Sequence, residues 1–75
     1  MPLNGRRILV VDDDEDRVEL ERVILIQARA DVRVARSVRE AIATIEDFAP
    51  DVVIADLAMP GEDAAGRRRV LLQVP

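Results

Sequence analysis

The chain has 75 residues, of which 49% are hydrophobic and 35% charged, and its formal net charge is -4. This composition indicates one globular domain over residues 1–75, and the negative charge argues against a nucleic-acid partner. The chain has no cysteine and no histidine, which excludes disulfides and soft-metal sites, and its short apolar runs predict a cytoplasmic protein without a membrane partner.

The first predicted strand is the apolar run Ile8–Val11, which shows no polar alternation. Such a run is typical of a strand that is buried on both faces of a parallel sheet. Asp14 then supplies the side-chain acceptor that a helix start favours. The pattern predicts a helix from about Glu15 to Arg29, although its centre has strand propensity as well. Four apolar residues support the helix by their spacing: Leu20, Val23, Ile24 and Ala28.

The segment Asp31–Ala35 alternates polar and apolar residues with a period of two, which predicts a strand at the edge of the sheet. Ser37 and Glu40 have the spacing of a capping box, in which each side chain accepts a hydrogen bond from the other residue's backbone amide. Pro50 ends the apolar stripe that follows. These features predict the second helix, whose apolar residues are Val38, Ala41, Ile42, Ile45 and Phe48 or Ala49.

The third predicted strand is the apolar run Val52–Ala55, which ends at Asp56. A turn is indicated at Pro60 and Gly61. The segment from Glu62 to Gln73 is expected to form a short final helix, although its glycine and three consecutive arginines are unfavourable. Strands that alternate with helices predict an α/β fold, with parallel strands joined by right-handed crossovers and the first strand in the middle.

Five consecutive carboxylates, Asp12 to Asp16, follow the first strand. Ligands gather outside the carboxyl ends of parallel strands, so we expect Asp12, Asp13 and Asp56 to converge there. A divalent cation would relieve their repulsion, and oxygen ligands without histidine or cysteine favour Mg²⁺. Asp56 would then be placed to attack phosphorus and form an aspartyl phosphate. The next three carboxylates are interpreted as residues of the helix start.

Three segments together resemble the receiver domain of two-component response regulators: Ile8–Asp13, Asp51–Asp56 and Met59–Gly61. The resemblance covers residues 6 to about 64. It implies a three-layer flavodoxin-like fold, truncated to the first three strands, with a parallel sheet of order 2-1-3.

The resemblance also implies roles for individual residues. Asp56 corresponds to the phosphoacceptor, and Asp12 and Asp13 correspond to the acidic pair that holds Mg²⁺, with Asp13 the more direct ligand. Ala58 would contribute its backbone carbonyl to the metal. The phosphoryl group would come from a histidine kinase or phosphotransfer protein, or from acetyl phosphate, and the chain would be a signalling module and not a turnover enzyme.

The chain departs from complete receivers, which continue with strands that carry a Ser or Thr and a Lys in contact with the phosphoryl group. It contains no lysine, and its hydroxyl residues Ser37 and Thr44 fall in the second helical unit. We therefore expect a phosphoacceptor module that is impaired. The alternative is a truncated receiver that serves only as a structural or association module.

The outer edge of Val52–Ala55 would have no neighbouring strand in such a fragment. Exposed strand edges tend to pair, which predicts a homodimer through this strand and residues 59–72. The basic run Arg67–Arg69 of one copy would then lie near the acidic cluster of the other.

Other acidic motifs fit less well. Asp12, Asp14 and Asp16 have the spacing of calcium-loop ligands, but Arg17 stands where that loop requires glycine and Val23 where it requires glutamate. The run Asp12–Asp14 after a strand also resembles the start of haloacid-dehalogenase-type phosphatases, with Asp12 as the nucleophile, but that fold needs a much longer chain. No glycine-rich phosphate loop follows the first strand, which argues against nucleotide binding.

Overall fold

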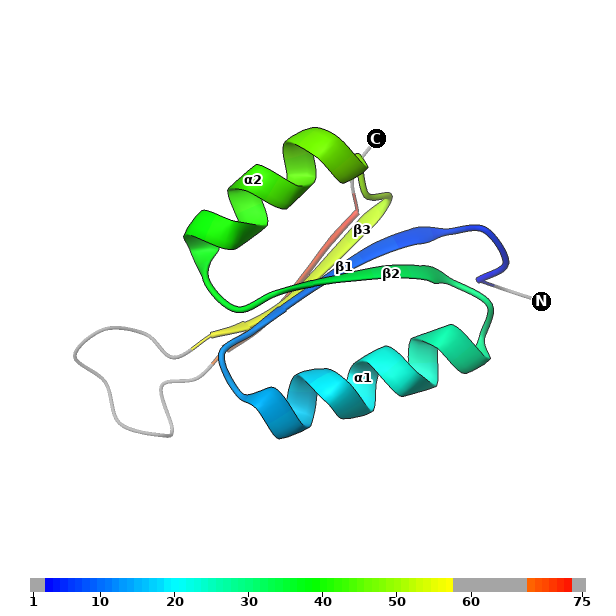
Figure 1. Ribbon diagram of the computed structural model, residues 1–75, viewed down its shortest axis with the longest axis horizontal. Coiled ribbons are helices and arrows are strands. Elements are labelled where there is room, and N and C mark those ends of the chain that lie inside the picture. The colour runs from blue at the N-terminus through cyan, green and yellow to red at the C-terminus, as the bar shows by residue number, and fades with distance from the viewer. Residues whose placement is uncertain (1–2, 58–67, 74–75) are drawn as a thin grey trace.

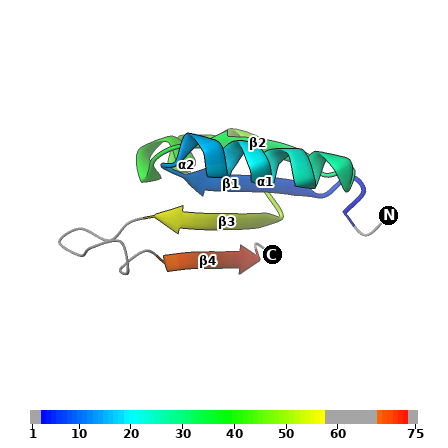
Figure 2. The same ribbon diagram turned by 90° about the horizontal axis from the view of Figure 1, so that it is seen from below.

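The computed structural model describes residues 3–57 and 68–73 of the chain. Its four strands form one sheet of order β2-β1-β3-β4 (Figures 1 and 2). The strands β1, β2 and β3 are parallel, and β4 is antiparallel to β3. The elements are β1 (Arg7–Asp12), α1 (Glu15–Gln27), β2 (Asp31–Ala35), α2 (Val38–Phe48), β3 (Val52–Leu57) and β4 (Arg68–Gln73).

The two helices cover opposite faces of the sheet, so the molecule has three layers (Figure 1). The predicted α/β class and the order 2-1-3 of the first three strands are confirmed. Strand β2 lies at the edge of the sheet, as its alternating sequence predicts. Neither helix of the described residues is long and apolar enough to cross a bilayer.

The strand β1 is the centre of the core. Ile8 and Val10 pack with Val18 on the side of α1, whereas Leu9 and Val11 belong to the cluster on the side of α2. All four β1 residues are buried because a helix packs on each face and a strand pairs along each edge. The apolar run without alternation therefore predicts the two-sided burial of β1 correctly.

The helix α1 begins where the sequence predicts and ends two residues earlier, at Gln27. Asp14 caps it, because its Oδ1 accepts a hydrogen bond of 3.0 Å from the backbone amide of Arg17. The side that faces the sheet carries Val18, which is buried, while Leu20 and Ile24 are more than half exposed. Since α1 is apolar on several sides, helical spacing predicts the helix without identifying its inward face.

The helix α2 begins with a cap that differs in one detail from the predicted capping box. Ser37 Oγ accepts a hydrogen bond of 3.1 Å from the amide of Glu40, as expected. The Glu40 carboxylate, however, accepts its bond from the amide of Arg36 and not from that of Ser37. The helix ends at Phe48, and its C-cap Ala49, which precedes Pro50, has a left-handed φ of 52°.

The prediction of a final helix is wrong for residues 68–73, which form the strand β4. The open edge of β3 offers backbone donors and acceptors, and β4 pairs with them in a register that places Leu71 opposite Ile54. Tertiary pairing therefore outweighs the local pattern, because strand formation depends strongly on packing against the neighbouring strand. The predicted turn at Pro60 and Gly61, and the rest of the expected helix, lie outside the described residues.

The cap of α2 generates the first prediction. We expect Ser37→Ala to lower the free energy of unfolding by about 1 kcal/mol, because the amide of Glu40 loses its acceptor. Urea denaturation followed by circular dichroism measures this loss. Ser37→Asp keeps an acceptor at the cap and should retain most of the stability. An unchanged midpoint for Ser37→Ala would show that the cap contributes nothing.

Candidate functional site

Two buried aspartates lie side by side where β1 and β3 end. Asp12 and Asp56 are register partners in the parallel pairing of these strands. Because side chains alternate along a strand, Asp12 lies on the same face as Val10 and Ile8, which is the face that α1 covers. The exposed fraction is 0% for Asp12 and 8% for Asp56. The sheet thus places two carboxylates under the first turn of α1.

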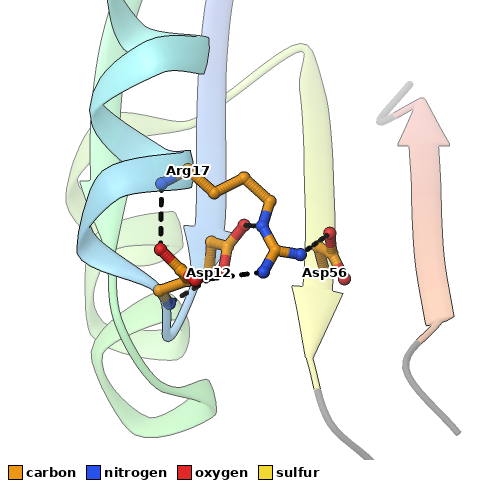
Figure 3. Close-up of polar contacts among 4 residues, drawn as sticks. Asp12, Arg17 and Asp56 are labelled. Atoms are coloured by element: carbon orange, nitrogen blue, oxygen red, sulfur yellow. Dashed lines mark hydrogen bonds and ion pairs between the residues drawn. The ribbon is translucent and has the colours of Figure 1, made fainter. Parts of the chain in front are cut away.

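Arg17 of α1 lies between these carboxylates (Figure 3). Its Nη1 donates to Asp56 Oδ2 at 3.0 Å, and its Nε lies 3.4 Å from Asp12 Oδ2. Its Nη2 donates to Asp14 Oδ2 at 3.2 Å. A single guanidinium therefore contacts three carboxylates: Asp12 at the end of β1, Asp14 just before α1, and Asp56 on β3.

Arg17 and the carboxylates that it contacts stabilise one another's charged forms. Hydrogen bonds from the guanidinium to Asp14 and Asp56 raise the pKa of Arg17 above its ordinary value. The hydrogen bond from the backbone amide of Arg17, together with the bond from its side chain, lowers the pKa of Asp14. A buried carboxylate is stable only when it is paired and hydrogen-bonded. For Asp12, the amide of Asp14 supplies a further hydrogen bond, of 2.9 Å to Oδ1.

A third carboxylate, that of Glu21, joins the two aspartates. Asp12, Glu21 and Asp56 each offer an oxygen that lies within 4.8 Å of the other two. Hard oxygen donors at this spacing suit a divalent cation such as Mg²⁺. The donor set therefore fits the predicted metal, which would enter a group of carboxylates that the guanidinium of Arg17 already contacts.

The convergence of Asp12 and Asp56 agrees with the sequence prediction. Asp13 follows directly after β1 and is exposed, and it is not one of the three clustered carboxylates. Its role as the more direct metal ligand stays a prediction. Ala58, the expected carbonyl ligand, lies outside the described residues. Asp14 is a helix cap, as interpreted from the sequence.

Sequence reasoning missed Arg17 and Glu21. They are spaced one turn apart on α1, on the side that carries Val18 towards the sheet. A charged pair at positions i and i+4 directly after an acidic strand end is the signal that points to them. The apolar residues on the other sides of α1 hide this signal, because they suggest that the charged pair faces solvent.

The acidic cluster generates the second prediction. In metal-free buffer, Arg17→Gln should lower the melting temperature, because the buried carboxylates lose their cation. Mg²⁺ should then raise the melting temperature of Arg17→Gln more than that of the wild type, and should bind it more tightly, because no guanidinium competes. Scanning calorimetry and titration calorimetry measure the two effects.

Arg22→Gln is the matched control for this prediction. Arg22 lies on the same helix and pairs with Glu19, which is not one of the clustered carboxylates. The Arg22→Gln variant should respond to Mg²⁺ as the wild type does. An equal Mg²⁺ response in Arg17→Gln and the wild type would contradict competition between the metal and Arg17.

Comparison with known proteins shows the family of this chain. Residues 8–67 match the family model of the response regulator receiver domain. The chain is 42% identical over 67 residues to an uncharacterised 14.6 kDa protein in the sodA1 3' region of Leptolyngbya boryana, with 85% of this chain and 51% of that protein covered.

Two further relatives carry functional names. The DNA-binding response regulator MtrA of Mycobacterium tuberculosis is 35% identical over 66 residues, which cover 88% of this chain and 29% of MtrA. The protein-glutamate methylesterase/protein-glutamine glutaminase 5 of Myxococcus xanthus is 39% identical over 67 residues, which cover 87% of this chain and 19% of that protein. The chain thus spans about half or less of the length of these relatives.

A search of the solved structures found no match. The family match extends from β1 into the segment before β4 and includes both aspartates of the register pair. The chain belongs to the response regulator receiver domain family.

Proposed function

We propose that the chain accepts a phosphoryl group on Asp56, with Mg²⁺ held by Asp12 and Asp13. Receiver domains are signalling modules of two-component systems, and they bind Mg²⁺ at acidic residues. The observation that supports Asp56 as the acceptor is its register pairing with Asp12 at the carboxyl ends of β1 and β3. Asp56 is also the carboxylate of β3 that the guanidinium of Arg17 contacts.

The proposed reaction is a nucleophilic substitution at phosphorus. A carboxylate oxygen of Asp56 forms the new bond, and the bond from phosphorus to the donor breaks. The leaving group is the imidazole of a phosphohistidine in a histidine kinase or phosphotransfer protein, or acetate when the donor is acetyl phosphate. When bound, Mg²⁺ would neutralise charge on the transferring oxygens. The amide of Asp14 orients Asp12 for this site through its hydrogen bond to Oδ1.

Slow phosphorylation stays a prediction. The hydroxyl of Ser37 caps α2, and the hydroxyl of Thr44 donates to the carbonyl of Glu40 within the same helix. Both hydroxyls are therefore engaged on α2, and the acidic cluster lies on the opposite face of the sheet, under α1. This placement supports the expectation that neither contacts a phosphoryl group on Asp56.

The third prediction tests the phosphoacceptor. After incubation with acetyl phosphate and Mg²⁺, intact-mass spectrometry should find one added phosphoryl group on the wild type and none on Asp56→Asn. Asp47→Asn, which changes an exposed aspartate of α2, should be phosphorylated like the wild type. An added phosphoryl group on Asp56→Asn, or a wild type that gains no phosphoryl group, would refute the assignment.

The second candidate function is association through the sheet edge. The homodimer was expected because β3 would have an open edge, and this premise is wrong, since β4 pairs with β3. The register also places Arg69 opposite Asp56 of its own chain. Among the described strands β4 is now the outer one, and its Leu71 and Leu72 are 69% and 56% exposed. We propose that a dimer would form through β4.

The fourth prediction tests this association. Light scattering at micromolar concentration should report a dimer for the wild type and a monomer for the double variant Leu71→Glu, Leu72→Glu, because like charges at the edge oppose pairing. Circular dichroism should show that the variant keeps its helices. A wild type that remains monomeric at this concentration would exclude the dimer.

A further inference from the structure

The guanidinium of Arg17 holds its three carboxylates with three different nitrogens. Nη1 contacts Asp56, Nε contacts Asp12, and Nη2 contacts Asp14. Its side chain is one third exposed, while that of Asp56 is almost buried, with 11% exposed. Arg17 is therefore the more exposed partner of this contact, and its guanidinium lies directly against the Asp56 carboxylate.

A phosphoryl group on Asp56 would require positive charge at this position. Phosphorylation adds negative charge and three strong acceptor oxygens, and here it would do so beside Asp12 and Glu21. Two other arginines, Arg7 and Arg22, have partners away from this site. Arg7 donates to the carbonyl of Phe48, and Arg22 pairs with Glu19.

We propose that Arg17 binds the phosphoryl group on Asp56, so that α1 supplies the cation that holds the modified side chain. The inference rests on the proposed phosphorylation of Asp56. It goes beyond that proposal because it gives a role in phosphoryl binding to a residue of the first helix. The planar guanidinium suits this role, since its nitrogens form a fork that matches phosphate oxygens.

The contacts indicate how Arg17 changes partners. Nη1 already lies 3.0 Å from Asp56 Oδ2, so oxygens added at Asp56 would come within reach of the same fork. The contact with the exposed carboxylate of Asp14 is the one that a phosphoryl group would replace. The cap of α1 would survive this change, because Asp14 Oδ1 is bonded to the backbone amide of Arg17 and not to its guanidinium.

This role differs in a measurable way from simple competition with the metal. If Arg17 only competed with Mg²⁺, its removal would improve phosphorylation as it improves metal binding. If Arg17 binds the phosphoryl group, its removal should lower phosphorylation even when Mg²⁺ saturates the site. The two effects of Arg17→Gln then have opposite signs.

The experiment uses acetyl phosphate at Mg²⁺ concentrations that saturate each variant, with intact mass as the readout. We expect Arg17→Gln to lower the phosphorylated fraction about tenfold or more, as for the loss of one charge-assisted hydrogen bond. Arg17→Lys keeps the positive charge but loses the planar guanidinium, and its phosphorylated fraction should lie between those of Arg17→Gln and the wild type. Arg22→Gln should match the wild type.

A second measurement uses the wild type alone and holds even if Arg17→Gln does not fold. On phosphorylation, the side-chain ¹⁵N resonances of Arg17 should shift, while those of Arg22 should stay in place. A wild type that gains phosphoryl mass at Asp56 without a shift at Arg17, or an Arg17→Gln variant phosphorylated as fully as the wild type, overturns the inference alone. A wild type that gains no phosphoryl mass overturns the proposed function, and the inference with it.

Discussion

The register pairing of Asp12 with Asp56 is the constraint on which this molecule depends. Two carboxylates buried side by side on one face of the sheet repel one another, and burial in a medium of low polarity strengthens that repulsion. The chain resolves the conflict with Arg17, whose guanidinium reaches both. This contact ties the first turn of α1 to the ends of β1 and β3, so local charge compensation also orients the helix over the sheet.

The same arrangement of carboxylates and arginine underlies the proposed phosphorylation of Asp56. A cluster of buried carboxylates that needs a cation would suit the proposed Mg²⁺, and a carboxylate next to bound metal would be a suitable phosphoryl acceptor. In that proposal Arg17 would compete with the metal, because metal and guanidinium would neutralise the same charges. Strand β1 holds Asp12 in a core that is packed on both faces, so the fold fixes this carboxylate. In the inferred phosphoryl binding, the more exposed Arg17 would be the residue that changes partners.

The strands β1, β2 and β3 could be predicted from the sequence because their apolar patterns report burial directly, and side-chain acceptors at Asp14 and Ser37 mark the helix starts. Parallel order and strand length then bring Asp12 and Asp56 together. The strand β4 was not predicted, because its pairing with the edge of β3 is a long-range interaction that the local sequence pattern does not report. Arg17 and Glu21 were missed since the apolar residues on several sides of α1 conceal which side faces the sheet.

The most direct test of this account is a double-mutant cycle on the contact between Arg17 and Asp56. Melting temperatures would be measured in metal-free buffer for the wild type, Arg17→Gln, Asp56→Asn and the double variant. The account predicts strong coupling: Arg17→Gln should destabilise the wild type and should do so much less when Asp56 is already neutral. Equal losses from Arg17→Gln in both backgrounds would show that the arginine does not compensate this carboxylate, and would contradict the central claim.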